Sequence, residues 1–273
     1  MKDKDLKRRM VGARETVKIT RAMQLVSASK MTRADKRLTA VKAFADDMKK
    51  IVERAGTENS PLSDGREVKH ITYIVVAADK GLCGDYNHRI LDFAKQRLES
   101  DGKENTVYPI GQMAREYFKK LGCGIRTKYI HLLQGALTEE MRSFAIDVAD
   151  DFLSGKTDEV HLVYTAVGDS PARQVTCDEI LLPFDKQKAS DEDVLEYKED
   201  IDGILKQYIW AKINVAVCSG DYAFQYKCMV AMQKATTNGE ELVDELNREV
   251  NRLRQEKITS ELMDSFSPQE ERE

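Results

Sequence analysis

Residues 6–31 read LKRRMVGARETVKITRAMQLVSASKM, and one set of positions in this stretch recurs at alternating steps of four and three residues. A repeat of 3.5 residues keeps one face of a helix against a partner and supercoils the pair to the left. The steps continue to Ala55, so a coiled-coil helix is predicted over residues 1–58. The predicted seam contains Leu6, Met10, Ala13, Val17, Thr20, Gln24, Ser27, Met31, Ala34, Leu38, Val41, Ala45, Met48, Val52 and Ala55.

A second seam lies near the other end of the chain, within a predicted helical range of 194–267. About 50 residues of the first helix would span roughly 75 Å, more than the diameter of a small domain, so part of it is expected to project. We expect the two helices to pair antiparallel within one chain; a homodimeric coiled coil and a helix inside an ordinary bundle are the alternatives. The second seam contains Met229, Met232, Thr236, Gly239, Val243, Leu246, Val250 and Leu253.

The chain between the two seams has a different composition. Residues 1–60 and 184–267 contain no proline, whereas ten of the fifteen glycines fall between Gly65 and Gly168. Because helix interiors disfavour both residue types, the middle is expected to hold a compact domain with loops. Predicted strands at 70–79, 105–111 and 158–167 alternate with predicted helices at 87–100, 112–122 and 138–155, with Thr138 as an N-cap. Residues 173–184 are predicted to form a strand pair or an extended edge.

This alternation predicts an α/β fold. We expect a long antiparallel coiled coil of the N- and C-terminal helices plus a central Rossmann-like α/β domain of doubly wound type. The predicted ranges are 1–58, 68–190 and 194–267, acting as one functional unit, with a polar linker at 185–193.

Composition argues against a uniformly basic nucleic-acid binder, an all-β protein and a membrane-spanning protein. Of the 273 residues, 33% are charged and 7% are aromatic, the formal net charge is −4 and the mean hydropathy is −0.52. No apolar run approaches the roughly 18–20 residues of a membrane-spanning helix. The five scattered cysteines form no CxxC pair, which favours a reducing compartment with free thiols.

One turn stands where doubly wound sheets bind ligands. Residues 77–87, AADKGLCGDYN, follow a predicted strand and precede a helix, but they match neither GxGxxG nor GxxxxGK[ST]. We therefore interpret Gly81 and Gly84 as turn residues and Cys83 as a buried structural thiol. The four histidines lack the spacing of metal ligands, and no nucleophile–histidine motif is present. We predict no metal, no cofactor and no catalytic residue.

Charge is concentrated at the N-terminus. Residues 1–56 carry 16 Lys/Arg and 7 Asp/Glu, a net charge of +9, which leaves −13 for the remainder. Such a helix suits nucleic acid, an anionic membrane surface or acidic protein loops. Its single aromatic residue, Phe44, argues against base stacking.

Four segments together resemble the gamma subunit of F-type ATP synthases, over essentially the whole chain. They are RRMVGARETVKITRAMQLVSASKM (8–31), ADKGLCGDYN (78–87), AMQKATTNGEEL (231–242) and NRLRQEKITSEL (251–262). The resemblance implies a rotor shaft whose coiled coil enters a ring of nucleotide-binding subunits. It implies that Met23, Arg254, Gln255, Thr259 and Glu261 contact the catalytic ring. It also assigns Lys18, Ile19, Thr20, Arg21, Ala22 and Lys30 to the coiled coil and its bearing, and Lys80, Gly81, Cys83 and Gly84 to the turn of the central domain.

The implied function is to couple ion-driven rotation to ATP synthesis or hydrolysis in the ring, with no catalytic centre in this chain. The implied partners are the alpha and beta ring subunits, the epsilon subunit and the c-ring of the membrane sector, without nucleic acid and with only peripheral membrane contact. No transit segment precedes Lys4, so we expect a bacterial protein on the cytoplasmic side of the cell membrane, with a mature organellar inner-membrane form as the alternative.

Departures from the family pattern keep other functions open. Asp85, Cys228 and Val250 stand where the family usually has glycine, arginine and tyrosine, and the end DSFSPQEERE is also unusual. A diverged gamma-like paralogue, or a coiled-coil adaptor without rotary function, is the alternative. A nucleotide-dependent enzyme would instead require the turn at 77–87 to bind a ligand.

Overall fold

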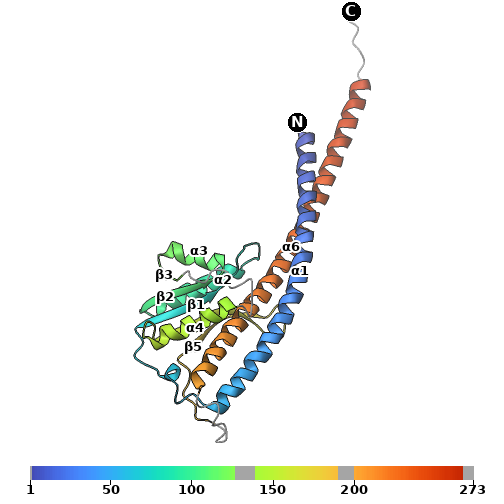
Figure 1. Ribbon diagram of the computed structural model, residues 1–273. Coiled ribbons are helices and arrows are strands. Elements are labelled where there is room, and N and C mark those ends of the chain that lie inside the picture. Colours follow the sequence, from blue (N-terminus) through green and yellow to red (C-terminus); the bar gives the residue numbers. More distant parts are fainter. Residues whose placement is uncertain (1, 127–138, 190–199, 267–273) are drawn as a thin grey trace, which may run out of the picture. The chain divides into compact units, whose positions relative to one another are not determined.

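The computed structural model describes residues 2–126, 139–189 and 200–266 (Figure 1). Its packing divides the chain into two units, one formed by residues up to 26 and from 229 onward, the other by residues 27–228. The division falls inside the two long helices, α1 (Lys2–Ala55) and α6 (Ile201–Phe266), so each helix contributes to both units. The three domain ranges predicted from the sequence follow element boundaries instead, and they stay a prediction.

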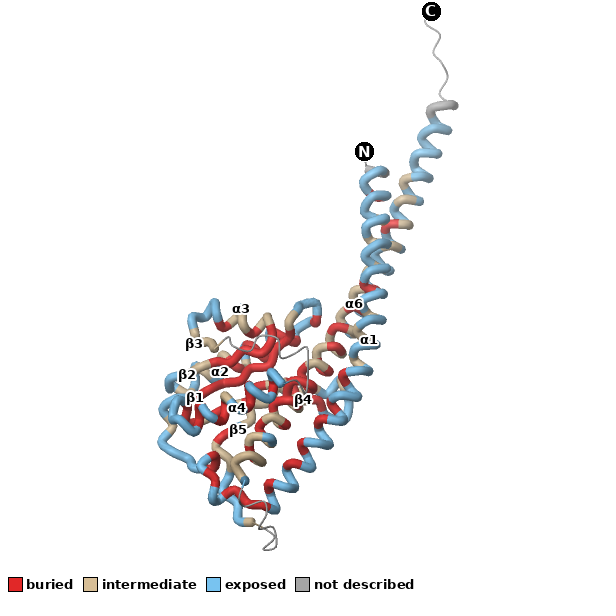
Figure 2. Tube along the Cα trace, in the orientation of Figure 1, coloured by how far each residue is buried: buried red, intermediate tan, exposed pale blue. Residues whose placement is uncertain are grey.

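The first unit is an antiparallel helix pair. The Thr20 and Thr236 hydroxyls lie 2.7 Å apart, and Arg14 donates to the Asn247 side-chain oxygen at 3.2 Å. Every described seam residue here is buried or half-buried, whereas most neighbouring positions are exposed (Figure 2). The predicted seams and their pairing within one chain are therefore confirmed.

The same seam continues through the second unit. Ala34, Leu38 and Val41 join a buried cluster with Tyr222 and Ala223 of α6. Further along α1, Ala45 and Met48 pack against Ala211. The 3.5-residue repeat thus holds α1 on α6 in this unit as well.

A five-stranded sheet forms the centre of the second unit, in the order β3-β2-β1-β4-β5. All neighbours are parallel except β4 and β5, which are antiparallel. The parallel strands need crossover connections, which the intervening helices supply. The strands are β1 (His70–Val76), β2 (Glu104–Ile110), β3 (Gly124–Ile125), β4 (Glu159–Val167) and β5 (Gln174–Leu182).

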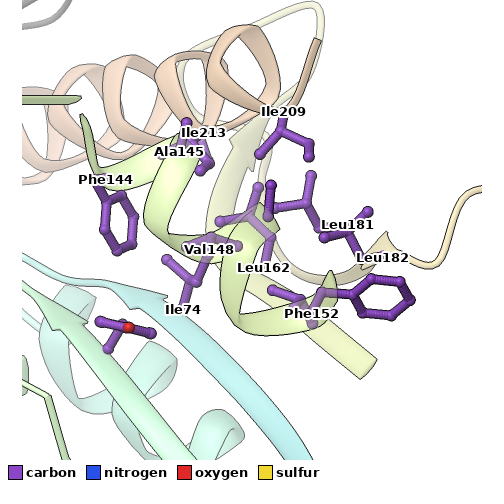
Figure 3. Packing of buried hydrophobic residues seen from close by; sticks show 14 of the residues in the cluster. Ile74, Phe144, Ala145, Val148, Phe152, Leu162, Leu181, Leu182, Ile209 and Ile213 are labelled. Atoms are coloured by element: carbon purple, nitrogen blue, oxygen red, sulfur yellow. The ribbon is translucent and has the colours of Figure 1, made fainter. Parts of the chain in front are cut away.

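Helices cover both faces of this sheet. On one face, Tyr73 and Val75 of β1 pack with α2 (Tyr86–Ser100) and α3 (Gln112–Leu121). On the other face, Ile74 and Val76 pack with α4 (Glu139–Leu153) and α6, where Ile213 meets Ala145 and Val148 (Figure 3). A short 3₁₀ helix, Pro61–Ser63, closes the end of the latter cluster through Leu62. Because β1 is buried on both faces, its sequence is a continuous apolar run rather than an alternating one.

Several predicted details differ from the structure. Of the two alternatives predicted for residues 173–184, the extended edge is confirmed, because Gln174–Leu182 forms one antiparallel edge strand; β1 ends at Val76 instead of residue 79. The two-residue strand β3 was not predicted, because Gly124 and Ile125 are too few to show a period. The predicted N-cap Thr138, part of the predicted linker (190–193) and Pro268 lie outside the described residues.

The described helices are unlike membrane-spanning segments. None combines the length and the apolar character that crossing a bilayer would demand.

Phe144 tests the core between α4 and the sheet. It is fully buried, with its ring centroid 5.2 Å from that of Tyr108. Phe144→Ala should lower the unfolding free energy of this unit by about 3–5 kcal/mol, because it removes buried contacts and leaves a cavity. Urea unfolding followed by the fluorescence of Trp210, the chain's single tryptophan, measures this change.

Ile146→Ala on the same helix is the matched control, because Ile146 is 39% exposed. It should cost less than about 1 kcal/mol. Equal losses in the two variants would contradict the packing described for α4.

Candidate functional site

Two polar side chains interrupt the apolar seam of the helix pair. Thr20 and Thr236 are buried, and their hydroxyls also lie within hydrogen-bonding distance of carbonyls of their own helices, Val17 at 3.1 Å and Met232 at 2.9 Å. One hydroxyl can donate to the other while the second donates to its own helix, so both are satisfied. A buried polar pair of this kind favours one register, because a shift of either helix removes the hydrogen bond between the two hydroxyls and sets each of them against a different residue.

A close helix approach lies one turn away from that pair. A Cβ atom built on Gly239 would stand 2.6 Å from Cγ2 of Val17. A larger residue at this seam position would therefore require the Val17 side chain to shift. The threonine pair and Gly239 together specify one antiparallel register.

The outer surface of the helix pair is unusually apolar. Leu25 is 67% exposed, Ile19 is 59% exposed and Met23 is 36% exposed, although none belongs to the seam. Soluble proteins rarely leave many large apolar side chains in water on one element, so this surface indicates a partner. The exposed large apolar residues of this unit are Val11, Ile19, Met23, Leu25, Val26, Val230, Leu242, Ile258, Leu262 and Met263.

The other N-terminal residues implied by the resemblance take different positions. Arg21 forms an ion pair with Glu240 across the helix pair, and Lys18 forms one with Glu15 at 2.9 Å within its own helix. Ala22 is exposed. Thr20 and Arg21 therefore hold the helices together, while Ile19, Ala22 and Met23 face outward.

The last turns of α6 extend past the start of α1. With Thr20 opposite Thr236, an antiparallel register places Lys2 level with Arg254, and α6 continues to Phe266 (Figure 1). Every residue from Arg254 to Met263 is exposed. A fully exposed helical segment of this kind is accessible to another chain. We call Arg254–Met263 the α6 tip.

Arg254, Gln255, Thr259 and Glu261 all lie on the α6 tip. Thr259 donates to the Gln255 carbonyl at 3.0 Å, and Glu261 lies 3.5 Å from Lys257. Among the described residues Arg254 forms no ion pair, so its guanidinium is available to a carboxylate of another chain. Ile258 and Leu262 were not predicted from the sequence. After Leu253 the seam steps of four and three residues fall on Lys257 and Ser260, which are polar, while the apolar residues stand at 258 and 262. This break in the repeat is the signal that could have identified them.

The predicted turn of the second unit lies between β1 and α2. Gly84 has φ +63°, and Leu82 has φ +61°, which is strained for a residue with a side chain. Leu82 is also 68% exposed, whereas Cys83 beside it is buried as predicted. The sequence did not single out Leu82, because a positive φ leaves no mark on a non-glycine residue.

A cleft of about 640 Å³ lies beside this turn, at the carboxyl end of β1. Its lining brings Lys80 of the turn together with Lys30 of α1, two residues that the sequence placed in separate groups. Arg33 and Arg37 also line it, and Arg37 lies 2.5 Å from Asp221. The excess of positive charge suits an anionic group. Among the described residues, no cluster of three or more His, Cys, Asp or Glu could hold a metal ion.

A sequence model of the family described as ATP synthase matches residues 2–267. The ATP synthase gamma chain of Moorella thermoacetica is 30% identical over 271 residues, covering 96% of this chain and 95% of that relative. The chain belongs to the ATP synthase gamma-chain family. The gamma chain of Clostridium botulinum strain Okra is 31% identical over 264 residues, covering 94% and 93%.

Solved structures agree on the fold of this family member. The rotor of the Euglena gracilis mitochondrial ATP synthase superposes with a TM-score of 0.69 at 15% identity, covering 94% of this chain and 99% of that one. The central stalk of the Tetrahymena thermophila enzyme gives 0.55 at 20% identity, covering 80% and 99%. The expectation of a gamma subunit of an ATP synthase is confirmed, and the chain is a component of an ATP-synthesising complex.

The threonine pair gives a test of register in this gamma chain. Thr20→Val and Thr236→Val should each lower the free energy of opening of the helix pair by about 1 kcal/mol, because each leaves the other hydroxyl with one partner fewer. The double variant should cost less than the two single changes together, since two facing valines make an apolar contact. Amide hydrogen exchange over residues 236–246 measures these energies.

Thr16→Val is the control, because the Thr16 hydroxyl is exposed and donates only to the Gly12 carbonyl at 2.9 Å. It should leave exchange unchanged. Strict additivity of the Thr20 and Thr236 changes would show that the two residues do not interact.

Proposed function

We propose that this gamma chain is the rotating shaft that couples ion flow to nucleotide chemistry in the ring of its ATP synthase. The supporting observation is the helix pair, which has an internally complete seam and a large apolar outer surface. An element whose seam is already filled needs no second copy of itself, so the outer apolar residues suit a surrounding sleeve of other subunits. The alpha and beta ring subunits are the proposed sleeve.

The proposed mechanism is a difference in binding energy. The exposed surface of the helix pair is not chemically uniform, because it carries apolar side chains at Ile19 and Leu25 and charged ones at Arg14 and Lys18. Ring subunits with identical sequences would therefore meet chemically different surfaces. Each contact biases its subunit toward one conformation and one nucleotide affinity, and rotation exchanges these states.

The α6 tip supplies the proposed hydrogen-bonding contact with a loop of a catalytic subunit, which we call the catch. Arg254 and Gln255 are adjacent and exposed, and a guanidinium beside an amide can hold a carboxylate and a carbonyl of one loop. Thr259 and Glu261 extend the polar surface, while Ile258 and Leu262 add apolar contact. Met23 and Ile19 are the proposed bearing residues on α1.

The second unit is the proposed attachment to the remaining rotor. Helices cover both faces of its sheet, and its edge strand β5 exposes Val175 and Ile180. The epsilon subunit and the c-ring are the proposed partners of this unit. This arrangement would hold the protein peripherally at the cytoplasmic face of a bacterial cell membrane, with no nucleic acid involved.

The chemistry of ATP is proposed to take place entirely in the ring subunits. The turn at residues 77–87 lacks the glycine spacing that cradles a nucleotide phosphate chain. The role of this chain is then mechanical.

Arg254→Ala with Gln255→Ala tests the catch in the assembled complex. The charge-assisted bond of Arg254 contributes about 1.5–3 kcal/mol and the amide bond of Gln255 contributes less, so losing the pair should lower torque and reduce coupled ATP synthesis by at least about tenfold. Alanine is a strong helix former and the tip is exposed, so the chain should remain folded. Single-molecule torque and ATP-driven proton or sodium uptake into vesicles are the measurements.

Arg252→Ala is the matched control on the same helix, because Arg252 is exposed and pairs with Glu256 of its own chain at 3.5 Å. It should retain full torque. If the double variant also kept full torque and coupling, the proposed catch would be wrong. Failure of the chain to copurify with nucleotide-binding subunits would contradict its proposed role as the rotating shaft.

A further inference from the structure

Two of the five cysteines meet inside the second unit. Cys83 comes from the turn between β1 and α2, and Cys228 comes from α6. Both are buried in one cluster that also contains Tyr86 and Phe224, whose ring centroids lie 5.8 Å apart. The residues beside the two cysteines also hold the turn against α6, because Lys227 forms an ion pair with Asp85 at 3.0 Å.

The surroundings of Cys83 favour its thiolate. The Asn87 side-chain nitrogen donates to Cys83 Sγ at 3.4 Å, and the other atom of that amide is held by the Ala78 N–H at 3.1 Å. Cys83 also stands just before the N-terminus of α2, where the helix dipole stabilises negative charge. The Asn87 amide is therefore fixed as a donor to Cys83 Sγ.

Opposite pKa shifts follow from this arrangement. The bond from Cys228 lowers the pKa of Cys83 to about 7, against the opposing effects of burial and Asp85. The same bond and burial raise the pKa of Cys228, with Lys30 acting in the opposite direction. One thiol is thus poised to ionise while its neighbour keeps its proton.

The other three cysteines have pKa values that are shifted upward. Burial raises the pKa of Cys218 to about 11, and burial also raises the pKa values of Cys123 and Cys177. Among the described cysteines, only Cys83 has both a stabilised thiolate and a second thiol as neighbour.

We propose that Cys83 and Cys228 form a reversible oxidation site, at which a peroxide converts the two thiols into a disulfide between the turn and α6. The Cys83 thiolate attacks one oxygen of hydrogen peroxide, the O–O bond breaks, and a sulfenic acid and hydroxide form. The Cys228 thiol then attacks the sulfenic sulfur. The S–O bond breaks, the departing oxygen is protonated to water by the Cys228 proton, and the hydroxide from the first step takes up the proton that Cys83 released when it ionised. Two thiols and one peroxide become one disulfide and two waters.

The bond would restrain the strained turn. Leu82, with φ +61°, directly precedes Cys83, and Lys80 of the same turn lines the basic cleft. Oxidation would fasten this segment to α6, and a dithiol reductant would release it. In a reducing compartment such a bond is transient and responds to oxidant.

The test is a thiol count on the full folded chain before and after hydrogen peroxide treatment. The remaining thiols are alkylated after denaturation, and the chain is digested without reductant for mass spectrometry. The wild type should fall from five alkylated cysteines to three and yield one peptide pair joining Cys83 to Cys228. Dithiothreitol should restore all five.

Three variants complete the design. Cys228→Ser should remove the linked peptide and leave Cys83 as a sulfenic acid that dimedone traps, and Cys83→Ser should slow peroxide consumption by about tenfold. Cys218→Ser, in the same buried cluster, should still form the linked peptide. Five remaining thiols in the folded wild type, a linked peptide that appears only in urea, or pairing of Cys83 with another cysteine would each overturn the proposal.

Discussion

The pairing of α1 with α6 is the interaction on which the rest of the structure depends. Both helices are long, and in the first unit each is held by one narrow seam rather than by a broad apolar face. A seam of apolar residues alone would tolerate a shift by one heptad. The buried threonine pair and the close approach at Gly239 limit that freedom, because a shift would break the bond between the two hydroxyls and move Gly239 away from Val17. The register then determines which residues of α6 continue past Lys2 as the α6 tip.

The seam also explains why so much of the helix pair can be apolar on the outside. Each seam uses about two positions in seven, so the remaining positions are free to meet other chains. In the second unit the same two helices keep their seam but turn other residues of α6, such as Ile209 and Ile213, onto the sheet. One pair of helices thus supplies both an internal core and an outward binding surface. The sheet itself has the topology of a nucleotide-binding fold without its phosphate-binding glycines, which illustrates that fold and chemistry are separate properties.

Sequence reasoning succeeded where a period extends over many residues. The seams from Leu6 to Ala55 and from Met229 to Leu253 repeat long enough that chance cannot produce them, and proline and glycine mark the domain between them. The buried strand at 70–76 was equally clear, because both of its faces are apolar. The two-residue strand β3 has no period to detect. Leu82 and the Cys83–Cys228 contact depend on how distant segments fold together, which no local pattern encodes. The tip residues Arg254 and Gln255 came from a resemblance between sequences, and only the structure adds that the segment carrying them is exposed.

Rotation of the helix pair inside its ring is the most direct test of the shaft. The assembled complex is fixed to a surface through its nucleotide-binding subunits, and a bead is attached to the unit formed by residues 27–228. On addition of ATP the bead should turn in one direction, in steps whose number per turn equals the number of catalytic subunits. A bead that stays still while the same complexes hydrolyse ATP at full rate would contradict the role of the helix pair as a rotating shaft.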